Sequence, residues 1–291
     1  MEIVRSNMKD NGFYRSFEDH FRGSRDLIKS RLQVYLPFVL KLRNTDPDFK
    51  SIDLGCGRGE WLELMVENGA LNSQGVDIDD AMLSACMDRG LNAIKSDAIS
   101  GLQALPAESL SIITGFHIAE HLPFDLLQIL VKEALRVLKP GGLLILETPN
   151  PENISVGTSS FYLDPTHKRP LPPQLLSFLA DHYGFHRTKI LRLQESPELR
   201  GAQTVELSHV IFGVSPDYAL VAQKQDTAGR QGLMDALFLE TYGLSLDVLS
   251  SRFDARLAEI EITIMPLRFI RYIYRILRYV RNSLKSLVGL R

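Results

Sequence analysis

Short apolar runs alternate with amphipathic stretches from about residue 50 to residue 224, and turn-forming residues separate them. The runs have the length of buried strands, and the stretches carry apolar residues at helical spacing. We expect strands at about 50–54, 73–77, 92–95, 111–116, 143–147, 185–193 and 217–224, with helices at about 60–68, 80–90, 125–138 and 173–183. This alternation is typical of an α/β fold with a doubly wound, mostly parallel sheet.

The two ends of the chain depart from this alternation. Residues 1–45 are expected to be helical in two pieces, and residues 225–232 have the composition of a linker. We therefore expect three parts: an N-terminal helical lid at 1–45, a central domain at 46–224, and a helical C-terminal appendage at 225–291. Within the appendage, an apolar stripe at 246–260 predicts a helix that packs on the body or pairs with another copy.

After Pro266 the appendage becomes a basic amphipathic segment, 266–291. Helical spacing puts its apolar side chains on one face and its basic side chains on the other. Seven of the 33 Lys and Arg lie in this segment, which has no Asp or Glu, so the other 26 face 35 acidic side chains. We expect the segment to bind either an anionic membrane surface or a partner protein. The acidic balance elsewhere disfavours binding of nucleic acid.

The chain has no apolar stretch of membrane-spanning length and no apolar core of a signal peptide. Its two cysteines, Cys56 and Cys86, imply no disulfide framework and fit a reducing compartment. We expect a cytoplasmic protein that the basic segment can hold at the inner face of the cytoplasmic membrane.

The first expected strand runs into a glycine-rich turn. Gly55, Gly57 and Gly59 stand at alternate positions, where glycine permits positive φ and a close approach of a ligand to the backbone. Such a turn at the end of the first strand of an α/β sheet is a site for nucleotide-like ligands. A dinucleotide fingerprint would need a further glycine where this chain has Glu60, so a nucleoside without a pyrophosphate fits better.

Carboxylates end three of the expected strands: Asp53, Asp77 and Asp97. Asp77 lies at the tip of the second strand, where a carboxylate can accept two hydrogen bonds from a ribose diol. Asp97 can accept a hydrogen bond from an adenine amino group while the N–H of Ala98 faces a ring nitrogen. Met82 is placed to cover the face of the adenine.

The motifs at 53–59, 75–79, 97–98 and 138–142 resemble, in order and spacing, those of class I S-adenosylmethionine-dependent methyltransferases. The resemblance spans about 51–224. It implies a seven-stranded sheet whose last strand is antiparallel, with S-adenosylmethionine as the cofactor. The expected cofactor-binding residues are Asp53, Gly55, Cys56, Gly57, Gly59, Trp61, Asp77, Ile78, Met82, Asp97 and Ala98.

A histidine-rich turn, Phe116-His117-Ile-Ala-Glu120-His121, follows the fourth strand. In the methyltransferases that the chain resembles, this position borders the transferred methyl group. If the acceptor is a hydroxyl, a base must take its proton, and His121 and His117 are the candidates. The spacing also resembles a His-x-x-Glu-His zinc motif, but the sequence presents no third ligand, so we expect no metal. A magnesium ion at Glu120 and His121, or a histidine that only caps the next helix, are the alternatives.

Residues 148–171 carry no expected element, and loops of this length inside a domain are usually functional. We expect the loop to bind the acceptor over the carboxyl end of the sheet, with a proline-stiffened connector as the alternative. The candidate catalytic residues here are Asp164 and His167, and the candidate substrate-binding residues are Phe161, Tyr162, Lys168 and Arg169. Aromatic faces stack on sugars, a carboxylate binds or deprotonates hydroxyls, and Lys and Arg bind phosphate or carboxylate.

The segments 13–23, 115–123 and 148–172 together are similar to methyltransferases encoded with bacterial surface-polysaccharide (O-antigen) assembly enzymes. This resemblance implies an acceptor oxygen on a sugar hydroxyl or a phosphate of a glycan or its lipid-linked precursor. Tyr14, Phe21 and Arg22 would then close over the cofactor. The alternatives are a small-molecule or lipid O-methyltransferase of the quinone-biosynthesis kind, and a non-catalytic binding module on the same scaffold.

Overall fold

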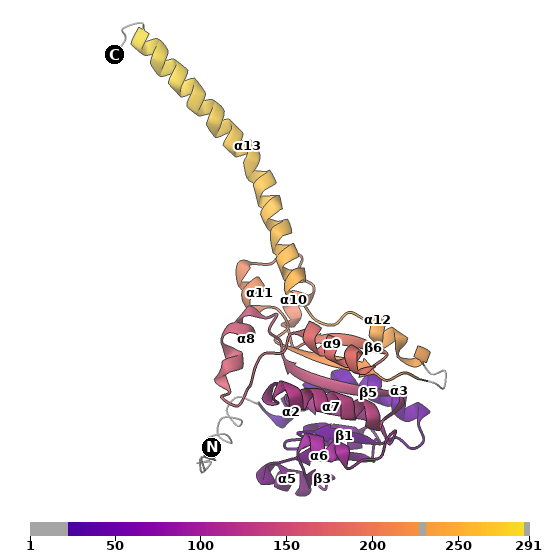
Figure 1. Ribbon diagram of the computed structural model, residues 1–291. Helices are drawn as coiled ribbons and strands as arrows, with labels where there is room; N and C mark the ends of the chain where they lie inside the picture. Colours follow the sequence, from indigo (N-terminus) through magenta and orange to yellow (C-terminus); the bar gives the residue numbers. More distant parts are fainter. Residues whose placement is uncertain (1–22, 227–230, 288–291) are drawn as a thin grey trace.

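A seven-stranded sheet lies at the centre of the protein (Figure 1). The computed structural model describes residues 23–226 and 231–287. In sheet order the strands are β3 (Ala93–Lys95), β2 (Ser73–Asp77), β1 (Ser51–Leu54), β4 (Leu110–Phe116), β5 (Leu138–Pro149), β7 (Asp217–Gln223) and β6 (Arg187–Leu193). All neighbours pair in parallel except β7, which is antiparallel to β5 and to β6. The predicted fold class is confirmed.

Helices cover both faces of this sheet. The helices of four or more residues are α2 (Arg25–Leu32), α3 (Leu36–Thr45), α4 (Glu60–Glu67), α5 (Asp80–Met87), α6 (Ala98–Gln103), α7 (Phe124–Val137), α8 (Ile154–Thr158), α9 (Pro173–Tyr183), α10 (Pro197–Arg200), α11 (Leu207–Phe212), α12 (Asp235–Leu239) and α13 (Leu246–Leu287). Short 3₁₀ turns occur at η1 (Gln33–Tyr35), η2 (Ala119–His121), η3 (Ser160–Leu163) and η4 (Gln231–Met234).

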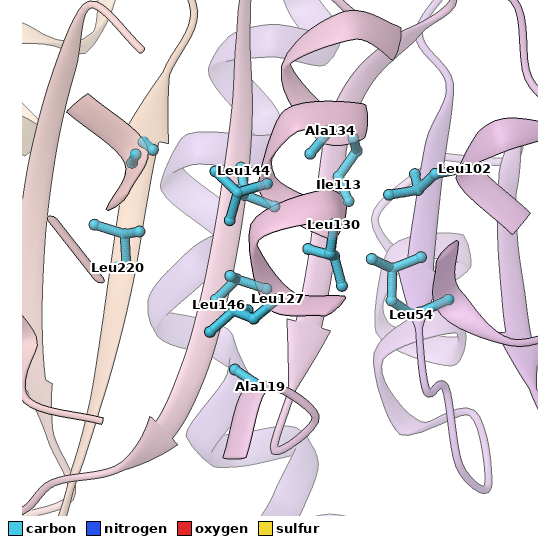
Figure 2. Close-up of a cluster of buried hydrophobic side chains, with 14 of the residues drawn as sticks. Leu54, Leu102, Ile113, Ala119, Leu127, Leu130, Ala134, Leu144, Leu146 and Leu220 are labelled. Atoms are coloured by element: carbon cyan, nitrogen blue, oxygen red, sulfur yellow. The ribbon is translucent and has the colours of Figure 1, made fainter. Parts of the chain in front are cut away.

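Two apolar cores lie on opposite faces of the sheet because successive strand residues point to opposite sides. Ile113 of β4 belongs to the core beneath α6, α7 and α9, and its neighbour Ile112 belongs to the other. On the first face, Leu127, Leu130 and Ala134 of α7 repeat at helical spacing against the strands (Figure 2). Each fully buried leucine contributes about 1.5–3 kcal/mol, so this layer holds the strand ends that form the site in place.

The second core includes α2 and α3. Tyr35 and Phe38 are fully buried in it, and Arg25 of α2 donates to Glu63 of α4 at 2.5 Å. Residues 25–45 are therefore packed into the central domain. The expected lid residues Tyr14, Phe21 and Arg22 lie outside the described residues.

Two expectations about loops and helices are corrected. The segment at 148–171 contains α8, with its N-terminus capped by Asn153, and the turn η3, so it is folded and not a bare connector. The helix expected to begin after Pro266 is instead part of α13, which runs from Leu246 to Leu287 through the proline. A proline inside a helix removes one backbone hydrogen bond, and here the helix continues on both sides of it.

Candidate functional site

The glycine loop connects the carboxyl end of β1 to α4 and lies beside the carboxyl end of β2. Gly55, Gly57 and Gly59 have φ of 68°, 53° and 81°, as the alternate spacing predicted. The N–H of Gly55 donates to the carbonyl of Val76 at 2.9 Å, and the N–H of Gly57 donates to Oδ2 of Asp77 at 2.8 Å. The loop is therefore folded against the end of β2, with the Asp77 carboxylate beside its backbone.

Packing underneath keeps the loop close to the sheet. A Cβ at Gly59 would lie 2.7 Å from Cδ1 of Leu91 and 2.8 Å from Sγ of Cys86, so only glycine fits at this position. Cys56 is buried, and its contact with the Cys86 thiol together with burial raises the pKa of Cys56. Asp53 is also buried and accepts from the Thr114 hydroxyl at 2.6 Å.

Glu60 occupies the position at which a dinucleotide fingerprint would have glycine. Its side chain is 3% exposed and lies 2.9 Å from Nε of Arg58 and 3.5 Å from Nη1 of Arg25. Two arginines balance the charge of this carboxylate, and the position carries a side chain where a dinucleotide fingerprint needs bare backbone.

The expected adenosine-binding residues lie along the edge formed by β2 and β3. Oδ1 of Asp77 accepts from the N–H of Asp79, while Ile78 is 69% exposed beside it and Met82 lies in the first turn of α5. Asp97 caps α6 by accepting hydrogen bonds from the N–H groups of Ile99 and Ser100. The pKa of Asp97 is lowered, most by the hydrogen bond from the Ser100 hydroxyl and then by those from the backbone.

Ala98 and Trp61 are both buried, Ala98 in the first core and Trp61 in the second. The Trp61 ring contacts Tyr35 and Phe116 edge to face, with ring centroids 6.1 and 5.3 Å apart. These contacts belong to the second core, which includes α2 and α3. The expected role of Trp61 in cofactor binding therefore remains a prediction, and its packing against Tyr35 is the contact that the structure describes.

A histidine between two carboxylates follows β4. His117 has φ of 55°, a left-handed conformation that is rare for a non-glycine residue, and its N–H donates to the carbonyl of Glu147. Its ring nitrogens lie 3.2 Å from Oε1 of Glu120 and 3.6 Å from Oε1 of Glu147, and both carboxylates are buried.

Burial lowers the pKa of His117, but the hydrogen bonds to Glu120 and Glu147 raise it by more, so the pKa ends well above its usual range. His117 is therefore an imidazolium at neutral pH. An imidazolium has no lone pair with which to accept a proton, so this charge state disfavours His117 as the general base, and its expected role in catalysis stays a prediction.

Sequence reasoning missed Glu147, the second buried carboxylate beside His117. The Tyr35 hydroxyl donates to its Oε2, and Nε2 of Gln194 donates to its Oε1 at 3.1 Å. Burial raises the pKa of the nearby Asp217 to about 6, with His117 opposing and Glu147 adding to the shift. The available signal was a charged residue at the end of the apolar run Leu143-Leu-Ile-Leu-Glu147, which a structural strand has no need to contain.

A second group joins η2 to the loop after η3. His121 Nδ1 lies 2.8 Å from the Thr166 hydroxyl oxygen, which lies 2.7 Å from Oδ1 of Asp164. The His167 ring contacts that of His121 edge to face at 4.7 Å, and its Nδ1 is 2.6 Å from the carbonyl oxygen of Phe161. The structure thus brings together three of the expected catalytic residues, His121, Asp164 and His167.

Burial lowers the pKa of His121; Glu120 opposes this and His167 adds to it. His121 is therefore neutral at neutral pH, in contrast to His117. Since a threonine hydroxyl has one proton and an ionised carboxylate only accepts, Thr166 donates to Asp164 and accepts from His121 Nδ1–H. The lone pair of His121 is then on Nε2.

The expected substrate-binding side chains separate into buried and open ones. Phe161 is 2% exposed and packs under His167, so its expected role as an open stacking face is corrected. Tyr162 is 62% exposed and can offer such a face. Lys168 and Arg169 are exposed; the N–H of Lys168 donates to the carbonyl of Glu120, and the Arg169 guanidinium lies over the ring of Phe124.

A cleft of about 300 Å³ opens near the carboxyl end of β6. Its walls are both polar and apolar: Gln194, Glu195, Ser196, Leu199, Ser208, His209, Phe212, Gly213, Val214 and Pro216. Gln194 also contacts Glu147, and Pro216 precedes Asp217, so the cleft adjoins the charged group around His117.

A seven-stranded sheet with an antiparallel β7 and a glycine loop at its carboxyl edge is the architecture of S-adenosylmethionine-dependent methyltransferases. Residues 25–191 match the family model described as a methyltransferase domain. A solved S-adenosylmethionine-dependent methyltransferase from Archaeoglobus fulgidus is 35% identical, with a TM-score of 0.64 over 73% of this chain and 100% of that one.

Two curated relatives also match part of this chain. A Mycolicibacterium smegmatis protein named "Probable S-adenosylmethionine-dependent methyltransferase" is 33% identical over 46% of this chain and 51% of its own length. A ubiquinone biosynthesis O-methyltransferase of Idiomarina loihiensis is 31% identical over 35% of this chain and 42% of its own. The chain spans about half the length of the curated relatives it matches. It belongs to the methyltransferase domain family, an enzyme family that uses S-adenosylmethionine.

Proposed function

We propose that this protein transfers a methyl group from S-adenosylmethionine to an oxygen atom of an acceptor. The observation that carries the proposal is the position of the glycine loop and Asp77 at the same edge of the sheet as the neutral His121. One end of that edge suits a nucleoside, and the other suits removal of a proton from a hydroxyl. S-Adenosylmethionine supplies an electrophilic methyl group on a sulfonium, and alignment with a nucleophile accounts for most of the catalysis.

The residues at the first end fit this cofactor. Asp77 binds the ribose hydroxyls, the backbone of 55–59 faces the methionine portion, and Asp97 with Ala98 binds the adenine edge. Ile78 and Met82 cover the adenine face. The fit rests on the bare backbone and positive φ of the three glycines at the end of β1 and on the carboxylate of Asp77 beside the loop.

At the other end, the acceptor hydroxyl loses its proton while the S–CH₃ bond breaks and the O–CH₃ bond forms. His121, neutral and with its Nδ1 tied to Thr166, is the imidazole that can assist. His117, held charged by Glu120 and Glu147, instead donates hydrogen bonds and offsets the two buried carboxylates.

For the acceptor we propose a hydroxyl or phosphate of a bacterial surface glycan or of its lipid-linked precursor. The open Tyr162 ring, the Asp164 carboxylate and the exposed Lys168 and Arg169 are the groups that support it, since they suit sugar and phosphate recognition. The second candidate is a quinone-like small molecule. The similarity to the Idiomarina loihiensis O-methyltransferase and the apolar walls of the cleft, Leu199, Phe212 and Val214, favour it.

An acceptor screen with methyl-labelled S-adenosylmethionine separates these candidates. Lipid-linked oligosaccharides, free oligosaccharides and hydroxylated quinone precursors are offered to the full chain, with Asp77→Ala as the inactive control. We expect label in the oligosaccharides. Label only in the quinone precursors would replace the glycan by the second candidate, and no release of S-adenosylhomocysteine with any acceptor would favour a non-catalytic binding module.

We also propose that α13 holds the enzyme at an anionic membrane surface. Its first turns pack on the body through Leu249 and Phe253, and Arg252 donates to the carbonyl of Leu199. Beyond them the helix projects away from the sheet (Figure 1). Among the described residues, no helix is long and apolar enough to cross a membrane.

The projecting part of α13 carries exposed apolar side chains at 269, 270, 273, 276, 277 and 280 opposite arginines at 271, 275, 278 and 281. An apolar face with basic side chains opposite lies in the plane of an anionic bilayer surface. We expect the full chain to pellet with vesicles containing phosphatidylglycerol and not with phosphatidylcholine alone. Replacing Ile273 and Leu277 by Glu should abolish pelleting, whereas a dimer in solution that pelleted with neither vesicle would identify α13 as a protein-binding helix.

A further inference from the structure

Three potential metal ligands from two segments meet on the acceptor side of the site. Glu120 and His121 lie in η2, and His167 lies in the loop after η3. Each of the three offers a ring nitrogen or carboxylate oxygen within 4.8 Å of those of the other two. Sequence reasoning lacked this third ligand, because His167 is 46 positions from His121. Ligand atoms around a tetrahedral ion are roughly 3.4 Å apart, which rotation of these side chains can reach.

The hydrogen bonds behind the two histidines already orient them for a metal. His121 donates from Nδ1 to Thr166, whose hydroxyl donates to Asp164, and His167 donates from Nδ1 to the carbonyl of Phe161. Metal-binding histidines almost always donate their second ring N–H to such a partner. In both rings the remaining lone pair is on Nε2, the atom a metal would use.

Glu120 is the anionic member of the group. Its side chain is fully buried, and the Thr148 hydroxyl donates to its Oε2 at 2.9 Å. Oε1 of Glu120 lies 3.2 Å from Nδ1 of His117, so each of its two oxygens has one hydrogen-bond partner. Each oxygen keeps a second lone pair, with which the carboxylate can bind an ion. The neighbouring group of His117, Glu147 and Asp217 also lies within 4.8 Å, but there the histidine is itself the cation between the carboxylates.

We propose that Glu120, His121 and His167 bind a divalent transition-metal ion, with Zn²⁺ as the best fit. Two imidazoles and one carboxylate suit such an ion, whereas Mg²⁺ and Ca²⁺ prefer oxygen ligands. Three protein ligands leave a fourth position open, as in catalytic zinc sites. The site stands on these side chains alone; only its role toward the acceptor rests on the proposed function.

That role follows from the open position. A Zn²⁺ held by Glu120, His121 and His167 would lower the pKa of an acceptor hydroxyl at that position, so the hydroxyl would lose its proton to water more readily as its oxygen takes the methyl group. The S–CH₃ bond then breaks as the O–CH₃ bond forms. In the metal-bound protein His121 would be a ligand, and the proton that His121 takes in the metal-free protein would go to water instead.

Metal binding by the tag-free full chain tests the site directly. After treatment with a chelator, the protein is titrated with Zn²⁺ and separately with Mg²⁺ by calorimetry, and bound metal is counted by mass spectrometry. We expect one Zn²⁺ per chain. His167→Ala should bind Zn²⁺ at least tenfold more weakly, and Thr166→Val should bind it about 10–100-fold more weakly through loss of the hydrogen bond behind His121. The exposed His182→Ala is the matched control and should bind as the wild type does.

Binding of S-adenosylhomocysteine to the same variants serves as the second readout, and we expect it to be unchanged in His167→Ala. Zn²⁺ binding that is absent, or equal in the wild type and His167→Ala, overturns the metal site and leaves the proposed function standing. Zn²⁺ binding without any methyl transfer to the acceptors overturns the proposed function and leaves the metal site standing.

Discussion

Removing the Asp77 carboxylate should weaken cofactor binding more than any other single change in the glycine-loop region. In the proposed complex the carboxylate accepts from two ribose hydroxyls, and hydrogen bonds to a charged group each contribute about 1.5–3 kcal/mol. Two of them amount to at least about 3 kcal/mol, or roughly a hundredfold in Kd. Asp77→Ala also removes the hydrogen bonds from the N–H groups of Gly57 and Asp79, which shape the loop before the ligand arrives.

Calorimetric titration with S-adenosylhomocysteine measures this loss. Asp80→Ala is the matched control, because its carboxylate is 77% exposed, lies three positions further on, and pairs only with the exposed Lys95 in the contacts described. We expect that control to bind within about twofold of the wild type, since exposed ion pairs contribute less than about 1 kcal/mol. If Asp77→Ala also binds within about threefold while its circular dichroism stays native, the assignment of Asp77 to the ribose is wrong.

Two further predictions concern stability. Asp46 accepts a hydrogen bond from Lys139 at 2.7 Å. Burial raises the pKa of Asp46, but Lys139 and the other hydrogen bonds lower it by more, so the net pKa is below the ordinary value. The stability that Asp46 contributes is therefore present above the ordinary aspartate pKa and is lost as the pH falls through the pKa of the folded state. Asp46→Asn should therefore cost about 1–2 kcal/mol in urea unfolding at pH 7 and progressively less as the pH falls below the ordinary aspartate pKa; a cost that does not change with pH would contradict the ion pair. Gly75→Ala would place a Cβ 2.6 Å from Sγ of Cys56 and should lower the free energy of unfolding by about 1–3 kcal/mol. Gly201→Ala, where no atom lies within 4 Å of the new Cβ, is the control and should be neutral. Equal melting temperatures for the two variants would refute the packing argument.

Local sequence determined the elements of the sheet and the cofactor end of the site. Strand-length apolar runs, helical spacing and turn residues each act over a few positions, so the order of strands and helices was readable. The glycine loop and Asp77 were readable for the same reason, since the loop, the strand that follows and its terminal carboxylate lie within about 22 positions. The motif order then pointed to the family that the comparisons support.

Tertiary structure decided the chemistry of the acceptor end. The loop at 148–171 folds into α8 and η3, and this brings His167 onto His121 and buries Phe161, which sequence had placed in the open. The charge on His117 depends first on Glu120 and then on Glu147, which is 30 positions away and is itself held by Tyr35 from the N-terminal helices. A side chain's burial and ionisation depend on neighbours that only the packed sheet assembles, and no local pattern records them.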